Sequence, residues 1–304
     1  MGVTKLIEKY FSYLLFLALI GGLFLPQIGI ILMPTIKPIL MVMLLLSALK
    51  TDFKQVISYL KKPGLPLYIF IMTMIIVPIM VFLITNQIDQ TLAIGLLLMT
   101  ATPPAIASPV LTELFKGNVA LSIVTVITCS LLSPITMPFL FNKLTSQSIE
   151  LDSIGMAKAL TFMIFTPIIL AEIIKKIRTI KPFLEKSKKH FSAINIILMS
   201  LLMWIGIAPQ ADTFLHNPLS IIKQLIALII LFTTMHFIGY MIAFWRKKED
   251  KISISTSMTY MNNSIAFVIA VEFFPPEVVL ITIVSQLTWN TFPSIFKQIS
   301  KHLS

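Results

Sequence analysis

Apolar stretches long enough to cross a membrane follow one another along almost the whole chain. The hydrocarbon core of a bilayer is roughly 30 Å thick, and a helix needs about 20 predominantly apolar residues to cross it. Of the 304 residues, 57% are hydrophobic and only 12% are charged, which is more apolar than a soluble domain of this length can bury. The chain is therefore expected to be an all-α integral membrane protein.

This length criterion divides the chain into about ten transmembrane helices. Shorter apolar stretches also count where a helix is broken and its backbone is covered by protein. The fourth and ninth segments are interrupted by polar residues. The predicted segments are residues 10–25, 29–49, 65–85, 91–115, 118–141, 154–175, 191–208, 219–245, 253–273 and 276–297.

The basic residues are distributed unevenly between the two sides that this count defines. All but four of the 24 Lys and Arg residues fall on one side, which the enrichment of Lys and Arg in cytoplasmic loops identifies as the cytoplasm. An even number of helices then places both termini in the cytoplasm. The largest basic group, at residues 175–189, is interpreted as a topology signal and is assigned no ligand. The four exceptions are Lys37, Lys143, Lys158 and Lys223.

Five predicted segments precede the polar stretch near residue 145, and five follow it. Two homologous halves that each contain an odd number of helices must have opposite orientations in the membrane, as in many secondary transporters. The sequence thus predicts a first five-helix repeat at residues 1–145 and a second, inverted five-helix repeat at residues 146–304.

The two interrupted segments occupy matching places in these halves. Prolines in the fourth segment remove backbone donors and clash one turn back, so the helix must unwind there. Neighbouring asparagines interrupt the ninth segment. Polar breaks at corresponding positions point to a transporter's binding site, although proline kinks and hydrogen bonds between helices are the alternative reading. The polar centres comprise Thr100, Thr102, Pro103, Pro104, Ser108 and Pro109, and Thr256, Ser257, Thr259, Asn262, Asn263 and Ser264.

Two motifs resemble those of the bile acid:sodium symporter family. Residues 117–122 (Gly-Asn-Val-Ala-Leu-Ser), followed by Ser133-Pro134 and Pro138, are similar to that family's fifth helix, and residues 261–264 (Met-Asn-Asn-Ser) are similar to a motif in its ninth helix. The resemblance implies panel and core domains, with helices 4 and 9 crossing in the core and substrate bound beside the crossing. It also implies alternating access by rocking of the core against the panel.

The sodium ligands of that family are only partly present. Ser108 and Ser122 match two serine ligands, whereas Met258 stands where family members with two sodium sites have a glutamate. A sodium site here would consist of neutral oxygens, so sodium coupling stays open. Four further ligand positions also differ, with Pro109, Val126, Thr73 and Asn262 replacing Asn, Thr, Gln and Gln. The candidate cation ligands are Ser108, Ser122, Thr125, Thr259 and Asn262.

The expected substrate is a small organic anion or a bile-acid-like amphipathic acid. His236 is the only titratable residue clearly inside a predicted helix, and it is either a proton carrier or a hydrogen-bonded packing residue. The candidate substrate-binding or crossover residues are Thr100, Thr102, Pro103, Pro104, Asn263, Ser264, Gln286 and Asn290.

The leading hypothesis is a secondary transporter in the inner or plasma membrane of a cell, with the lipid bilayer as its surroundings. A sodium-independent facilitator, uncoupled or proton-coupled, is the alternative within transport, and a structural membrane protein is the alternative outside it. Paired acid and base residues, nucleophile motifs and metal-ligand spacings are missing, so no enzyme, cofactor or metal beyond sodium is expected. The formal net charge of +11 lies in short clusters, which argues against nucleic acid.

Overall fold

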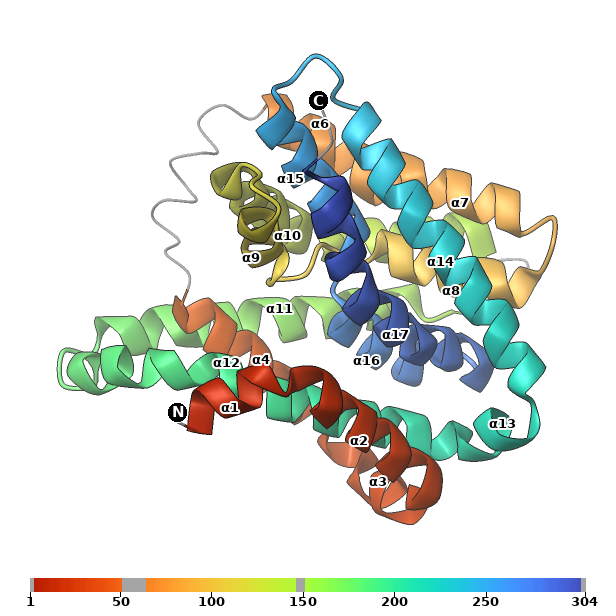
Figure 1. Ribbon diagram of the computed structural model, residues 1–304, viewed down its shortest axis with the longest axis horizontal. Helices are drawn as coiled ribbons and strands as arrows, with labels where there is room; N and C mark the ends of the chain where they lie inside the picture. Colours follow the sequence, from red (N-terminus) through yellow and green to blue (C-terminus); the bar gives the residue numbers. More distant parts are fainter. Residues whose placement is uncertain (1–2, 51–63, 146–150, 302–304) are drawn as a thin grey trace. The chain divides into compact units, whose positions relative to one another are not determined.

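The computed structural model describes residues 3–50, 64–145 and 151–301, which are helical apart from short connections and one isolated β-bridge (Figure 1). Lys54, Lys61 and Lys62, which the topology prediction places in the cytoplasm, lie outside these residues, as does the predicted start of the second repeat at residue 146. The chain forms two compact units. Unit 1 consists of Met1–Thr51 and Ala159–Leu219, and unit 2 consists of Asp52–Lys158 and Ser220–Ser304.

Unit 1 is organised around one long helix, α12 (Lys181–Ile207). Helices α2, α3 and α4 all pack against α12, and Figure 1 shows α12 running beside them. A Cβ atom on Gly21 would lie 2.8 Å from the ring of Trp204, so the close approach of α2 to α12 requires glycine there. The other helices are α1 (Val3–Lys9), α2 (Phe11–Phe24), α3 (Pro26–Leu32), α4 (Ile36–Lys50), α13 (Ala211–His216) and, from Ala159, α11 (Ser153–Lys176).

Unit 2 contains the remaining helices, including both predicted interruptions. Helix α6 (Gly64–Ile71) continues through a π-helical turn at Met72–Ile76 into α7 (Val77–Thr85). The other helices are α8 (Gln90–Ala101), α9 (Ser108–Leu114), α10 (Val119–Thr145), α14 (Pro218–Met241, in unit 2 from Ser220), α15 (Lys248–Thr259), α16 (Asn263–Phe273) and α17 (Pro276–Ile299).

Among the described residues, seven helices are long and apolar enough to cross a membrane. Three shorter apolar helices, Tyr13–Phe24, Gln90–Ala101 and Asn263–Phe273, coincide with the first predicted segment and with parts of the two interrupted ones. The prediction of a helical integral membrane protein is confirmed.

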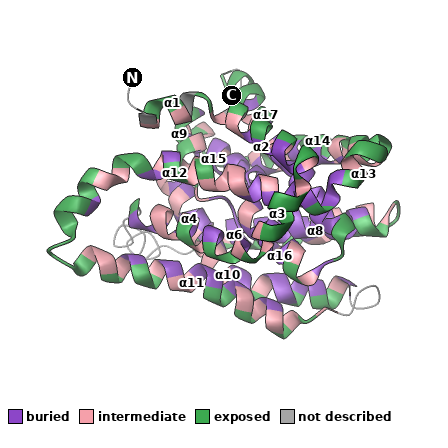
Figure 2. Cartoon of the chain, turned by 90° about the horizontal axis from the view of Figure 1, so that it is seen from below, coloured by how far each residue is buried: buried purple, intermediate pink, exposed green. Residues whose placement is uncertain are grey.

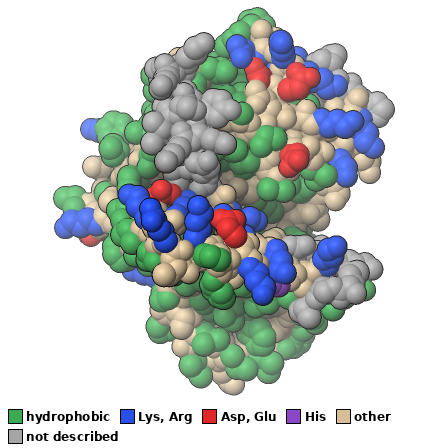
Figure 3. Space-filling model, turned by 90° about the vertical axis from the view of Figure 1, so that its left-hand side faces the viewer, with side chains coloured by type: hydrophobic (Ala, Val, Ile, Leu, Met, Phe, Trp, Pro, Cys, Tyr) green, Lys and Arg blue, Asp and Glu red, His purple; other side chains and the backbone are tan. Residues whose placement is uncertain are grey.

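The start of α12 corrects the predicted seventh segment. The helix begins at Lys181, ten residues before the expected boundary at 191, so the basic residues from 181 to 189 are helical. Lys188 pairs with Glu185 one turn earlier at 2.6 Å, which is a contact that supports an exposed helix. The apolar criterion missed this polar extension because it detects only the part that suits a bilayer. Figure 3 shows how Lys and Arg side chains gather in groups on one surface.

Helix α8 forms the centre of unit 2. Every residue from Leu92 to Ala101 is buried, and α7, α10, α16 and α17 all pack against this helix. Gly95 faces Ile281 of α17 so closely that a Cβ atom would collide with its side chain. In contrast, buried and exposed residues alternate around α10 and α11 (Figure 2). The fourth predicted segment therefore begins as an interior helix of this unit.

Asp89 fixes the start of α8 and ties it to α14. Its Oδ1 accepts the N–H of Leu92 at 2.9 Å, and its Oδ2 lies 2.6 Å from the Lys223 ammonium. The hydrogen bond from Leu92 and then the hydrogen bond from the Lys223 ammonium lower the pKa of Asp89 below its ordinary value of 3.8. As the pH falls, Asp89 is protonated at a higher pH in the unfolded chain than in the folded protein. The charged carboxylate therefore stabilises the fold above about pH 4, and this contribution is lost as the pH falls through the lowered pKa of the folded state.

We expect Asp89→Asn to lower the melting temperature at pH 7, by an amount that shrinks as the pH falls below about 4. Asparagine caps a helix nearly as well as aspartate, so the variant loses mainly the charge. Thermal unfolding of both proteins between pH 3 and pH 8 measures the difference. A difference that stays constant with pH would show that the Asp89 charge does not act on stability.

Candidate functional site

The first break follows from the two consecutive prolines. Helix α8 ends at Ala101, and Thr102 before Pro103 is extended, with φ −74° and ψ 138°. Proline disfavours the helical conformation of the residue that precedes it, and it has no N–H to continue the helix. Helix α9 resumes at Ser108, with Pro109 in its first turn, where a missing N–H costs nothing.

The second break contains no proline. Helix α15 ends at Thr259, and α16 begins at Asn263. Asn262 caps the new helix, since its side-chain oxygen accepts the N–H of Ile265 at 3.3 Å. Both interruptions that the sequence predicts are therefore confirmed, and here an asparagine cap starts the second half-helix.

The two breaks pair with each other, and the place where they pair is referred to as the crossing. An antiparallel bridge joins Pro104 to Met261, in which the Asn262 N–H donates to the Pro103 carbonyl and the Ala105 N–H donates to the Tyr260 carbonyl, both at 2.8 Å. Unwound backbone at membrane depth must find partners within the protein. The crossing thus provides partners for the Asn262 and Ala105 N–H groups and for the Pro103 and Tyr260 carbonyls.

Several predicted cation ligands lie beside the crossing. The Ser108 hydroxyl donates to the Tyr260 carbonyl at 3.2 Å, and Ser122 on α10 lies 3.2 Å from Ser257 on α15. Thr125 and Thr259 donate to carbonyls one turn earlier in their own helices, each at 2.9 Å. A hydroxyl that donates in this way keeps its oxygen lone pairs, which are suitable ligands for a cation. Asn262, by contrast, uses its oxygen as a cap.

Other predicted site residues make contacts within their own helices or lie in the first turn of one. Thr100 and Thr102 are buried and donate to carbonyls of α8, namely those of Leu96 at 2.8 Å and Leu98 at 2.7 Å. Their side chains stabilise the end of α8. Ser264 follows Asn263 in the first turn of α16 and is partly buried.

The amide side chain of Asn263 stands out because it is buried without partners. It is 4% exposed, and neither its oxygen nor its nitrogen has a hydrogen-bond partner. The side-chain oxygens of Gln286 and Asn290 on α17 are also buried and unpaired, while Asn290 donates its amide to the Gln286 carbonyl at 2.7 Å. An unpaired buried polar group costs about 1–3 kcal/mol, so its retention calls for an explanation such as a ligand.

Trp289 links α17 to the crossing. Its indole N–H donates to the Met261 carbonyl at 3.1 Å, and its ring packs edge-on against Tyr260, with centroids 5.6 Å apart. Trp289 was not among the predicted site residues, although its neighbours Gln286 and Asn290 were. A signal was present, because a buried indole N–H needs an acceptor and unwound backbone supplies one.

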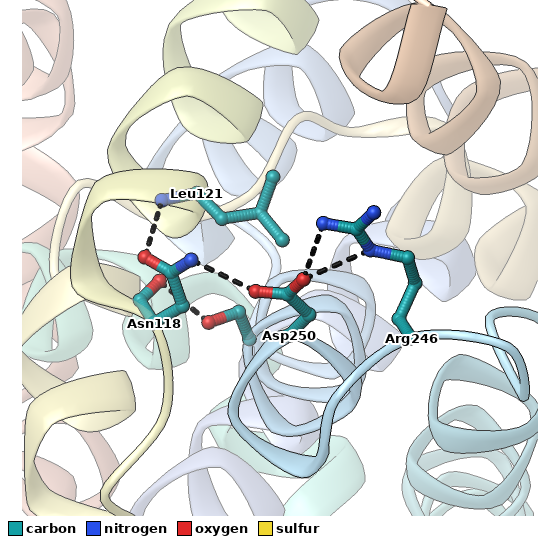
Figure 4. Close-up of polar contacts among 5 residues, drawn as sticks. Asn118, Leu121, Arg246 and Asp250 are labelled. Atoms are coloured by element: carbon teal, nitrogen blue, oxygen red, sulfur yellow. Dashed lines mark hydrogen bonds and ion pairs between the residues drawn. The ribbon is translucent and has the colours of Figure 1, made fainter.

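A charged cluster ties the start of α10 to the start of α15 (Figure 4). Asn118 donates its side-chain amide to Asp250 Oδ1 at 2.8 Å, and its own Oδ1 accepts the N–H of Leu121 at 3.2 Å. Arg246 Nε and Nη2 lie 2.9 and 2.7 Å from Asp250 Oδ2. Asp250 is only 6% exposed, so the first turn of α15 holds a buried carboxylate.

The same cluster explains residues 117 and 118 of the family-like motif. Lys116 has φ 62°, and a Cβ atom on Gly117 would lie 2.8 Å from Thr112 and 2.9 Å from Ile252. Only glycine allows this turn to approach α15. The Asn118 N–H then donates to the Glu249 carbonyl at 2.9 Å. The motif therefore positions helices beside the crossing.

The chemistry available at the crossing is that of neutral oxygens and amides. In the part of the chain that the structure describes, His, Cys, Asp and Glu do not form a group of three that could hold a metal ion. Met258, at the position where the related family has a glutamate, is 2% exposed. The arrangement suits weak ligation of a hard monovalent cation and hydrogen bonding to a polar solute.

A family model described as the SBF-like CPA transporter family matches residues 9–285. The chain belongs to this family. The predicted relationship to bile acid:sodium symporters is thereby confirmed, and the prediction of a transporter in place of an enzyme is confirmed with it. This SBF-like chain is a multi-pass membrane transporter.

Curated relatives of this SBF-like transporter are distant. An uncharacterized protein of Bacillus subtilis, YbaS, is 24% identical over 212 residues, which cover 68% of this chain and 68% of that protein. The probable chloroplastic sodium/metabolite cotransporter BASS2 of Oryza sativa subsp. japonica is 25% identical over 289 residues, covering 92% of this chain and 67% of the relative. The corresponding BASS1 protein is 23% identical over 66% of this chain and 49% of its own length.

Proposed function

We propose that this SBF-like transporter is a secondary carrier that moves a small organic anion or an amphipathic acid by alternating access. The observation that carries this proposal is the paired crossing of two broken helices beside the buried and unpaired amide of Asn263. Broken helices in transporters offer free backbone groups and side chains to substrates and ions. A purely structural membrane protein has no use for such a site.

The two halves at residues 1–145 and 146–304 are proposed to be inverted five-helix repeats, which gives ten transmembrane helices and places both termini in the cytoplasm. The composition of the units supports this proposal, because each unit takes a segment from the first half and a matching segment from the second. Unit 2, which holds the crossing, corresponds to the expected core domain, and unit 1 corresponds to the expected panel domain. The proposed location is the plasma or inner membrane.

We propose that sodium is the coupling ion and that it binds among neutral oxygens. The candidate ligands Ser108, Ser122, Thr125 and Thr259 are all buried, and their hydroxyl oxygens keep lone pairs after their own hydrogen bonds are counted. The name of the BASS2 relative supports sodium as the ion. Asn262 contributes as the cap that fixes the start of α16, and carbonyls of the crossing complete the ligand set.

The substrate is proposed to meet the polar groups around the second break. Asn263, Gln286 and Asn290 offer buried amide groups that have unused hydrogen-bonding capacity. Pro103 and Pro104 shape the crossing, while Thr100, Thr102 and Ser264 lie at the ends of the two half-helices. The unpaired Asn263 amide N–H would donate to an oxygen of the acid, and the unpaired side-chain oxygens of Asn263, Gln286 and Asn290 would accept from a hydroxyl or N–H of the substrate.

A sodium-independent carrier, uncoupled or proton-coupled, is the second candidate. The observation that favours it is Met258, which is buried where the related family has a carboxylate. Without that carboxylate, a cation at this position would meet neutral oxygens alone among the candidate ligands. The two candidates differ in a single measurable property, which is the effect of sodium on the native state.

We expect sodium chloride to raise the melting temperature of the detergent-purified protein above that in potassium or choline chloride at equal ionic strength. A ligand that binds only the native state stabilises it by about 2.7 kcal/mol at 100 times its dissociation constant. The rise should saturate with sodium, and Ser122→Ala should shift the half-saturating concentration upward. Equal melting temperatures in the three salts would favour the sodium-independent carrier.

A further inference from the structure

His236 lies in unit 2 among groups that the transport proposal does not use. The imidazole on α14 is 7% exposed, with Nδ1 2.9 Å from Ser255 Oγ and Nε2 3.2 Å from the Tyr260 hydroxyl. Its ring stacks on Phe296 of α17, with centroids 3.8 Å apart. Three helices therefore converge on one buried imidazole.

The donors and acceptors around the His236 imidazole determine its tautomer. Ser255 donates its single hydroxyl proton to the backbone carbonyl of His236 at 2.9 Å. Its oxygen can then only accept from the ring, so Nδ1 carries the proton. Nε2 is left as an acceptor, and the Tyr260 hydroxyl is its donor. A neutral imidazole thus satisfies every partner in the cluster.

Tyr260 connects this cluster to the crossing of the two breaks. Its side chain is fully buried, and its hydroxyl meets His236. Its backbone carbonyl accepts both the Ala105 N–H at 2.8 Å and the Ser108 hydroxyl at 3.2 Å. Tyr260 therefore contacts the imidazole through its side chain and the pairing of the two breaks through its backbone.

The surroundings disfavour a charged imidazole. The residues packed around Tyr260 and His236 are aromatic or aliphatic, and a second proton on Nε2 would take away the acceptor of the Tyr260 hydroxyl. The aromatic cluster around Tyr260 also contains the titratable Tyr240, whose ring has the Lys251 ammonium 4.5 Å from its centroid. The members of this aromatic cluster include Phe115, Phe232, Phe292, Phe296 and Trp289.

We propose that His236 is a positioning residue that stays neutral and holds the crossing of the two broken helices in register through Tyr260. It is not the carrier of a coupled proton. Its Nδ1–H anchors it to Ser255 on α15, and its Nε2 orients the Tyr260 side chain. This role follows from backbone pairing within unit 2 and holds whether or not sodium binds.

Hydrogen–deuterium exchange of the detergent-purified protein tests the proposal without any substrate. Asparagine at 236 reaches only the Nδ1 position and keeps the Ser255 bond, whereas glutamine reaches the Nε2 position and keeps the Tyr260 bond. We expect His236→Asn and Tyr260→Phe each to raise exchange at the Ala105 and Asn262 amides about tenfold, which corresponds to about 1.4 kcal/mol of lost protection. His236→Gln should stay within about threefold of wild type.

Two further readouts complete the test. The double variant His236→Asn/Tyr260→Phe should match the single variants, because both remove the same interaction. Thr233→Val, which removes an exposed hydroxyl bonded only to Ile229 on the same helix, is the matched control and should leave the crossing unchanged. Equal losses in His236→Gln and His236→Asn, or a step in wild-type protection between pH 5 and 8, would overturn the proposal. Tyr260→Phe keeps the ring and nearly the whole side-chain volume, so this variant is expected to fold.

Discussion

Replacing Asn263 by leucine is expected to leave the ligand-free transporter as stable as before, or more stable, while its uptake of substrate is lost. Both polar atoms of this side chain are buried without partners, and leucine has a similar shape. Removing an unsatisfied polar group recovers about 1–3 kcal/mol of desolvation cost. Melting temperatures of the ligand-free protein and uptake into proteoliposomes measure the two effects.

The adjacent residue is the matched control for this prediction. Asn262→Leu makes the same chemical change but removes the cap on Ile265, which typically costs about 1 kcal/mol. Its melting temperature should therefore fall where that of Asn263→Leu does not. An equal fall in both variants would show that the Asn263 amide is structural, and the unpaired amide would no longer support a binding site.

Asp250→Ala is expected to cause the largest loss of stability, about 2–3 kcal/mol, seen as a fall of roughly 5 °C or more in melting temperature. The carboxylate is buried and binds both Asn118 and Arg246. Removing it leaves the Asn118 side-chain amide without its acceptor and takes away the charged contact between the starts of α10 and α15, while the backbone bond from Asn118 to Glu249 remains. The estimate lies below that for a fully buried ion pair because the Arg246 side chain is 42% exposed.

Glu249→Ala provides the control for charge. Glu249 lies in the same first turn of α15, carries the same charge and is exposed. Only its backbone carbonyl contacts Asn118, and the substitution keeps that carbonyl. We expect Glu249→Ala to change the melting temperature by no more than a degree or two. A comparable loss in both variants would mean that the general charge of this turn, and not the Asp250 contacts, stabilises the unit.

The sequence predicted the helices and the two breaks well because both depend on local chemistry. Apolar length marks a membrane helix, and Pro103 and Pro104 exclude a continuous helix wherever they occur. Asn262 also signals a new helix start by its preference for the cap position. The early start of α12 escaped prediction because an exposed basic stretch has no apolar signature.

The sequence did not predict which residues contact the site residues. The pairing of Pro104 with Met261 and the contact of Asn118 with Asp250 join residues more than a hundred positions apart, and they arise from how the helices pack. The same holds for His236, whose role stayed open until the hydrogen bonds to Ser255 and Tyr260 were known. The two units are likewise discontinuous in sequence, because contacts follow packing and not chain order.

The backbone bridge between the two breaks also limits which changes in length the breaks tolerate. Pro103 and Pro104 have no N–H groups, so this strand offers only acceptors at two successive positions. Asn262 therefore donates to Pro103, and Ala105 supplies the first N–H after the prolines and meets Tyr260. Sliding either strand by one residue would set a proline against a carbonyl that needs a donor. Insertions and deletions are consequently excluded from both breaks, whereas the connections between helices tolerate changes in length.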